Sequence, residues 1–204
     1  MAKQGREKII ATAFTLFLSK GYRKTSLNDI ISATNSSKGA VYHHFKSKNA
    51  IYLAALDEYF FKLYDDLLIQ DTNASFSERI KSRFLFFVDL IDFVEKSGEG
   101  VTFPIRHYYL FQLESEEDDD IRSKITETLI IYRSEIQKIV EQAIQNKEIK
   151  ISLSTSIIAQ QLISIIEGTA IHNSTLEKNS KPFLLQKYDE VIQPYINLLT
   201  NQTK

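Results

Sequence analysis

Apolar residues recur every three to four positions along most of the 204-residue chain, which is the spacing of helices with one buried face. Six glycines and three prolines leave long stretches free of helix breakers. The pattern therefore predicts an all-α fold of about nine helices. They are expected over residues 3–19, 25–35, 38–45, 48–70, 76–96, 103–113, 116–147, 154–173 and 182–201.

Two short helices joined by a tight turn are predicted between residues 25 and 48. The hydroxyl of Thr25 or Ser26 can cap the first helix, whose apolar residues follow at helical spacing. This helix is expected to end near Asn35, because asparagine tolerates the left-handed conformation that terminates helices. Ser36 and Ser37 offer the next cap. The pattern is that of a helix-turn-helix, a module that places its second helix in the major groove of DNA.

The second of these helices has two distinct faces. Val41 and Phe45 lie four residues apart and are expected to point inward. Because adjacent positions cannot all face the core, polar residues are left outside, where they suit base edges and phosphates. The outward residues are Lys38, Gly39, Tyr42, His43 and His44. Ser47 and Lys48 add a helix N-terminus and a positive charge that favour an anion.

Charge is distributed unevenly along the chain, although the net charge is only −1. Residues 1–48 contain nine Lys or Arg against two acidic residues, a balance of +7. The remainder holds 16 basic and 24 acidic residues, a balance of −8. Such asymmetry is typical of a nucleic-acid-binding domain joined to a domain that does not bind nucleic acid.

The composition of the chain indicates the compartment in which the protein works. The chain has no cysteine, so disulfides and thiolate metal sites are excluded. No segment approaches the roughly 18 uninterrupted apolar residues of a membrane span, and the N-terminus lacks the apolar core of a signal peptide. A cytoplasmic protein without a membrane partner is expected.

Several segments in the first quarter of the chain resemble the DNA-binding domain of the tetracycline-repressor (TetR) family. In chain order they are 13–17, Gly21-Tyr22, Thr25, Asp29-Ile30 and 37–48. The last is the most specific. Asn35 stands where the family usually has glycine, and Asn49 and Ala50 stand where acidic residues are frequent. The resemblance implies a three-helix DNA-binding domain over residues 1–48 and a larger helical effector-binding and dimerisation domain over residues 49–204.

The resemblance also implies a function, a dimeric repressor that binds a palindromic operator in double-stranded DNA and is released by a small molecule. We expect Lys38, Gly39, Tyr42 and His43 to meet bases or sugar-phosphate. Thr25, His44 and Lys48 are expected to hold the DNA backbone. The expected DNA contacts are Thr25, Ser37, Lys38, Gly39, Tyr42, His43, His44 and Lys48.

The last two helices are long and more apolar than one packing face requires. Two such helices from each of two chains would form a four-helix bundle. The resemblance implies the same homodimer. Pro194 lies inside the last helix and is expected to kink it.

An apolar or aromatic effector is expected, because the middle helices are rich in aromatic residues and poor in buried charge. The lining candidates combine an apolar body with a polar tip or a ring, although aromatics at helical spacing are more often simple core. They are Tyr64, Phe84, Phe87, Phe103, His107, Tyr108, Phe111, Tyr132 and His172.

No cofactor or metal is expected. The alternative, in which His107 and His172 ligate a metal, is the weaker interpretation, as is a cation site at residues 116–120, whose carboxylates suit the first turn of a helix.

Two other classes of protein compete with a ligand-responsive regulator. An enzyme is disfavoured, because the chain has no nucleophile elbow, no glycine-rich phosphate loop and no His-Glu metal pair on one helix. A ligand-independent architectural DNA-binding protein is the other alternative. A closed apolar pocket between the middle helices would favour the sensor, and a packed interior would favour the architectural protein.

Overall fold

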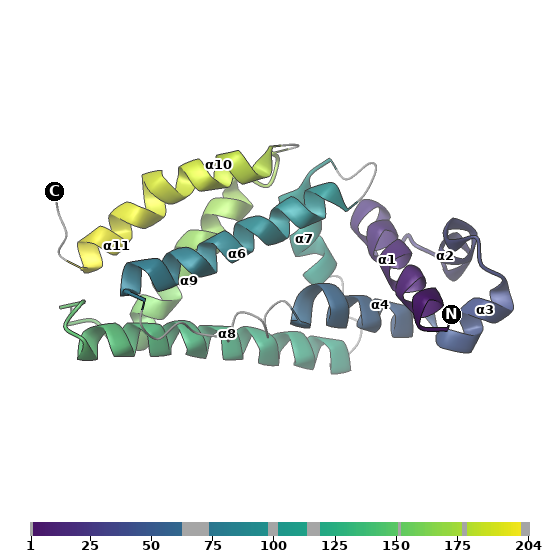
Figure 1. Ribbon diagram of the computed structural model, residues 1–204, viewed down its shortest axis with the longest axis horizontal. Helices are drawn as coiled ribbons and strands as arrows, with labels where there is room; N and C mark the ends of the chain where they lie inside the picture. The colour runs from purple at the N-terminus through teal and green to yellow at the C-terminus, as the bar shows by residue number, and fades with distance from the viewer. Residues whose placement is uncertain are drawn as a thin grey trace.

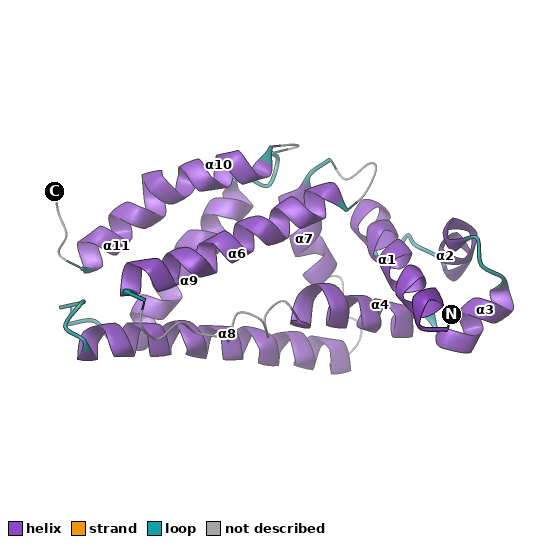
Figure 2. Ribbon diagram, viewed as in Figure 1, coloured by secondary structure: helices purple, strands orange, loops and turns teal. Residues whose placement is uncertain are grey.

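The computed structural model describes residues 2–62, 74–97, 102–113, 119–150, 152–176 and 179–200, and every regular element in these ranges is helical (Figure 2). The all-α class predicted from periodicity is confirmed. The α-helices are α1 Ala2–Lys20, α2 Leu27–Thr34, α3 Lys38–His44, α4 Lys48–Leu56, α6 Phe76–Lys96, α7 Pro104–Leu113, α8 Asp119–Gln145, α9 Thr155–His172, α10 Ser180–Lys187 and α11 Gln193–Leu199. Two π-helical segments are η1 Asp57–Phe61 and η2 Tyr188–Ile192.

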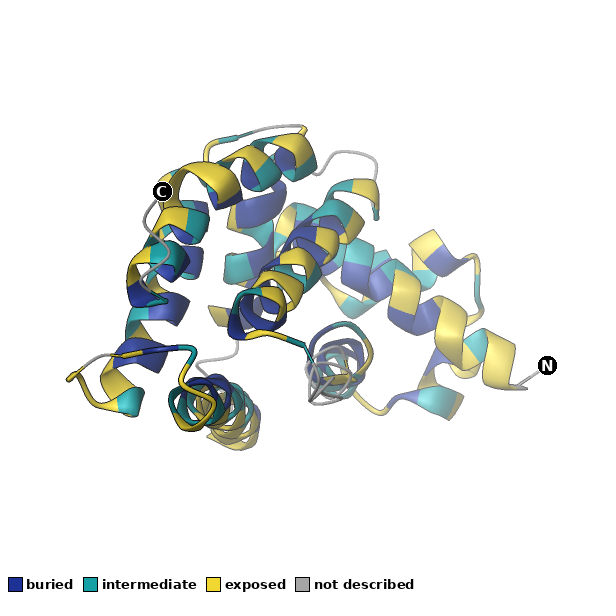
Figure 3. Cartoon of the chain, turned by 60° about the vertical axis from the view of Figure 1, so that its left-hand side comes forward, coloured by how far each residue is buried: buried dark blue, intermediate teal, exposed yellow. Residues whose placement is uncertain are grey.

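The molecule is elongated, with α1 to α3 at one end and α11 at the other (Figure 1). We call α1 to α3 the head and α6 to α11 the body. α4 packs on α1 and leads from the head into the body. In the body α8 packs on α9, and α10 packs on α6. Figure 3 shows buried positions on the inner sides of these helices and exposed positions on their outer sides.

The head is held together by one apolar core. α1 contributes Ala13 and Phe17, α2 contributes Ile30, and α3 contributes Val41, all of them at most 2% exposed. The serine caps form as predicted: Ser26 accepts a hydrogen bond from the Asp29 backbone N–H, and the Asp29 side chain completes a capping box. These caps fix where α2 begins, and therefore how α3 leaves the turn.

Asn35 ends α2 in the left-handed conformation, with φ of 52°. Its side chain is exposed, so its backbone conformation matters more than its packing. We expect Asn35→Ala to lower the free energy of unfolding by about 1 kcal/mol, since a Cβ without a compensating local hydrogen bond is strained there. Asn35→Gly should keep or raise it. Urea denaturation measures both, and equal stability of the alanine variant and the parent would contradict the argument.

Both π-helical segments interrupt helices that the periodicity predicted as continuous. In η1 the Lys62 backbone N–H donates to the Asp57 carbonyl, and the extra residue allows Phe60 and Phe61, neighbours in sequence, both to be buried. In η2 the Gln193 N–H donates to the Tyr188 carbonyl immediately before Pro194, which has no N–H to donate. The expected kink at Pro194 is thus realised as a change of helical register.

Some expected features lie outside the described residues. The helix predicted over 48–70 is seen as α4 and η1, and Tyr64 and the rest of that range are not described. The acidic run 116–120 is described only from Asp119, where α8 begins. No helix within the described ranges has both the length and the apolar character that crossing a membrane requires.

Candidate nucleic-acid interface and interior cavity

α3 presents to solvent the face predicted from its sequence. Val41 and Phe45 are buried at 0% and 4% exposure. Lys38, Gly39 and His43 are exposed, and the Tyr42 ring is 38% exposed. Ser37 caps α3 by accepting a hydrogen bond from the Ala40 backbone N–H. The outer face therefore offers a cation, a close backbone approach and ring-borne donors on one short helix.

The exposed side chains of α3 are partly ordered by one another. The Lys38 ammonium lies 5.7 Å from the centroid of the Tyr42 ring, and Lys46 donates to the Tyr42 carbonyl at 3.4 Å. The His43 and His44 rings are 5.1 Å apart in an edge-on arrangement. These are weak surface contacts, so the side chains remain available to a partner in solution.

Three other expected DNA contacts are placed further inside the head. Thr25 is 1% exposed and donates its hydroxyl to the Gly21 carbonyl at 2.8 Å. The Lys48 ammonium donates to the Tyr22 carbonyl at 2.8 Å and lies 4.0 Å from the centroid of the Tyr22 ring. His44 is half-buried. Thr25 thus ties the turn before α2 to the end of α1, and Lys48 ties the same turn to the start of α4, structural roles that the sequence interpretation missed.

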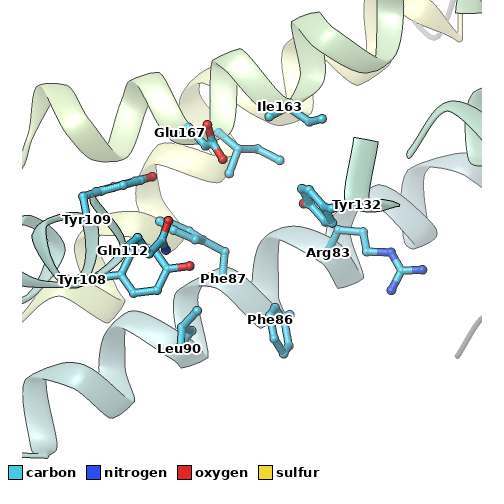
Figure 4. Close-up of a pocket in the computed structure, with 11 residues that line it drawn as sticks. Arg83, Phe86, Phe87, Leu90, Tyr108, Tyr109, Gln112, Tyr132, Ile163 and Glu167 are labelled. Atoms are coloured by element: carbon cyan, nitrogen blue, oxygen red, sulfur yellow. The ribbon is translucent and has the colours of Figure 1, made fainter. Parts of the chain in front are cut away.

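A small cavity lies in the body between α6, α7, α8 and α9 (Figure 4). Its volume is about 20 Å³, roughly the space that one water needs. Its walls combine rings, a guanidinium and a carboxylate. They are Arg83, Phe86, Phe87, Leu90, Tyr108, Tyr109, Gln112, Tyr132, Ile163, Ile166 and Glu167.

Of the nine expected lining residues, Phe87, Tyr108 and Tyr132 are at this cavity. Phe84 packs in the core beside Tyr188, with ring centroids 5.0 Å apart. His172 is exposed. Phe103 and His107 lie at the start of α7 away from the cavity walls, and Phe111 faces the head.

Sequence reasoning missed the charged residues of the cavity. Arg83 is 7% exposed, and burial lowers the pKa of its guanidinium. Burial raises the pKa of the Glu167 carboxyl, and the Arg133 charge opposes this only in part. A signal was present in the sequence, since Glu167 directly follows the apolar pair Ile165-Ile166 and is the one charged residue of α9 apart from its terminal His172.

A larger hollow of about 360 Å³ adjoins the cavity and opens near the head. Phe86 and Leu90 of α6 line both spaces. Its remaining lining residues are Glu58, Tyr59, Asp89 and Phe93.

Aromatic contacts connect the head to the body. The Phe14 ring of α1 stacks on Tyr59 of η1 at 4.1 Å between centroids and meets Phe111 of α7 edge-on at 5.1 Å. The Tyr52 hydroxyl of α4 donates to the Phe111 carbonyl. Because the neighbouring residues Tyr108, Tyr109 and Gln112 line the cavity, α7 touches both the cavity and the head.

This sequence and fold are similar to those of known bacterial regulators. Residues 9–55 match the family of bacterial regulatory proteins, tetR family. The HTH-type transcriptional regulator YerO of Bacillus subtilis is 26% identical over 92% of the chain and 64% of its own length. The biofilm operon icaADBC negative transcriptional regulator IcaR of Staphylococcus aureus is 36% identical over 40% of the chain and 44% of its own length. The chain thus spans less than two thirds of either relative.

Solved structures of transcriptional regulators share this fold over nearly the whole chain. A TetR transcriptional regulator from Chloroflexus aurantiacus is 25% identical, with a TM-score of 0.67 over 96% of both chains. A transcriptional regulator from Aquifex aeolicus is 21% identical, with a TM-score of 0.70 over 94% of this chain and 99% of its own. Residues 9–55 thus form a DNA-binding domain of the TetR family, and the chain as a whole has the fold of TetR-family transcriptional regulators.

Proposed function

We propose that the protein is a homodimeric repressor that reads a palindromic operator with α3 and releases it when a small molecule binds in the body. The observation that carries the proposal is the exposed face of Lys38, Gly39, Tyr42 and His43 over a buried Val41 and Phe45. A cation and ring-borne donors on a helix of this length suit base edges and phosphates in a major groove.

The sign of regulation is proposed from the S. aureus relative, whose name describes a negative regulator. The test is to capture genomic DNA fragments with the purified protein and to compare transcription of the captured genes in cells with and without it. We expect transcripts downstream of the captured sites to rise when the protein is removed. Unchanged or falling transcripts at those sites would contradict repression.

The body supports the proposed sensor through α7 rather than through the size of the cavity, which is about that of one water. Cavity residues Tyr108 and Tyr109 lie on the same helix as Phe111, which contacts the head. A ligand that moves α7 would therefore also move a contact of α1 and α4. The physical requirement is that the ligand binds one arrangement of α7 more tightly than the other.

The proposed dimer uses the outer faces of α9 and of the α10 to α11 segment. Ile157 and Ile171 of α9 are 48% and 52% exposed, and Leu198 of α11 is 62% exposed. Gly168 lies between the two isoleucines, and a Cβ added there would meet nothing within 4 Å. Exposed apolar residues around an open glycine allow a second copy of the helix to approach closely.

We expect Ile171→Asp to convert the protein to a monomer at micromolar concentration, because a dimer would bury the new carboxylate without a partner. Operator affinity should fall with dimerisation, since one head alone reads one half-site. Sedimentation velocity measures the first effect. Ile130→Asp is the matched control, because Ile130 is 55% exposed on α8, away from the proposed interface. Dimers in both variants would contradict this interface.

A further inference from the structure

Glu167 is an unusual residue for the wall of an aromatic cavity. It lies on α9 among apolar neighbours and shares the cavity with five aromatic rings. These rings are Phe86, Phe87, Tyr108, Tyr109 and Tyr132. Figure 4 shows the Glu167 carboxylate on the side of Tyr109 and Gln112, while the Arg83 guanidinium points away at the opposite side.

The charges around Glu167 do not neutralise it. Within the described ranges, no hydrogen bond or ion pair joins its carboxylate to another side chain, and the charge that favours its ionised form is that of Arg133, an exposed residue of α8. Arg83 interacts instead with Glu135 and Tyr132 of α8, and Arg79 with Gln142 and Glu148. Glu167 is half-buried, and a carboxylate that is partly withdrawn from water without a close cation favours protonation or a ligand that supplies the charge.

The aromatic rings of the cavity also favour a positively charged ligand. The face of a phenol or phenyl ring carries partial negative charge and attracts ammonium groups, most strongly where water is excluded. An anion would meet these ring faces and Glu167 unfavourably, and the one guanidinium in the wall already interacts with Glu135. The cavity thus combines a carboxylate with rings, which is the chemistry of cation recognition.

We infer that the effector carries a compact positive charge, a protonated amine or a quaternary ammonium group, held beside Glu167 and against the rings of Tyr108, Tyr109 and Phe87. This rests on the proposed function, because it names the ligand class of the proposed sensor. It revises the purely apolar or aromatic effector expected from the sequence. The apolar part of such a ligand extends between α6 and α7.

The cavity of about 20 Å³ must open to admit this ligand. Phe86 and Leu90 line both this cavity and the adjoining hollow of about 360 Å³. Displacing them gives the ligand its volume and a path from solvent. Glu58 and Asp89 at the hollow pair with Lys62 and Lys181, so the charge that selects the cation is that of Glu167.

Isothermal titration calorimetry with matched probes tests the inference. Benzyltrimethylammonium carries the cation, neopentylbenzene is its neutral isostere, and phenylacetate is the anionic alternative. The parent protein should bind the cation at least about tenfold more tightly than either other probe. Glu167→Gln should reduce cation affinity at least about tenfold and leave the weak affinity for the neutral probe unchanged.

Glu127→Gln is the matched control, since Glu127 is an exposed carboxylate of α8 outside the cavity walls. Glu167→Gln should fold as well as the parent, because it removes a buried charge. The inference is overturned by equal affinity for cation and isostere, by tighter binding of phenylacetate, by unchanged cation affinity in Glu167→Gln, or by no binding of the cation.

Operator binding of the same preparations is measured without ligand and with each probe. This measurement distinguishes failure of the cationic effector from failure of the proposed repressor function. Operator binding that phenylacetate or neopentylbenzene releases and the cation does not would leave a ligand-released regulator and overturn only the cationic effector. Absence of sequence-specific DNA binding in the ligand-free protein would instead overturn the proposed function.

Discussion

A variant carrying Lys38→Ala together with Tyr42→Ala is expected to bind its operator about 100-fold more weakly than the parent protein. Each side chain is exposed on the outer face of α3, and a single contact to a base edge or phosphate is typically worth about 1 to 3 kcal/mol. Two contacts of about 1.4 kcal/mol correspond to two factors of ten. Fluorescence anisotropy of labelled operator DNA measures the change.

Stability should not change in this variant, because neither side chain contributes to the core. Lys96→Ala is the matched control for the loss of one positive charge, since Lys96 is exposed at the end of α6 and pairs with Asp92. The salt dependence of binding shows whether Lys38 contacts a phosphate or a base edge. If Lys38 binds a phosphate, Lys38→Ala lowers the slope of log affinity against log salt by about one. Parental affinity in the double variant would show that α3 is not the reading helix.

Phe14→Ala should lower the free energy of unfolding by about 3 to 5 kcal/mol, the range for deleting a buried aromatic ring. Phe14 is 3% exposed and contacts the rings of Tyr59 and Phe111 at the junction of head and body. The space left by its ring is walled by three helical segments, which cannot all move inward to fill it. Urea denaturation followed by circular dichroism measures the loss.

Phe14→Leu preserves an apolar side chain at this junction and should cost clearly less than the alanine variant. Leu113→Ala is the control for removing an apolar side chain, because Leu113 is 60% exposed at the end of α7. If Phe14→Ala is no less stable than that control, the ring cluster does not hold head and body together, and the proposed path from α7 to the head loses its physical basis.

The head was largely predictable from sequence, because local chemistry determines it. The Ser26 and Ser37 caps, the left-handed Asn35 and the inward Val41 all follow from rules about single residues and their nearest neighbours. The structural roles of Thr25 and Lys48 were harder to predict. Both bond to backbone carbonyls of the turn between α1 and α2, and sequence spacing does not reveal that the Tyr22 carbonyl lies within reach of Lys48.

The cavity was much less predictable, since its walls come from four helices whose rotation is set by tertiary packing. Phe84 and Phe87 share a helix and a residue type, yet only Phe87 reaches the cavity. The π-helical turns add to the difficulty. Each inserts a residue into a helix, so the face predicted before the turn is not the face presented after it.

Selection of bound sequences from a random pool of DNA duplexes tests the central claim, that a pair of α3 helices reads DNA. The account predicts enrichment of an inverted repeat whose half-site centres are separated by about one helical turn or a multiple of it. It also predicts that the Lys38→Ala, Tyr42→Ala variant fails to enrich that repeat. A pool that remains random for the parent protein, or an enriched sequence without two-fold symmetry, would contradict the account.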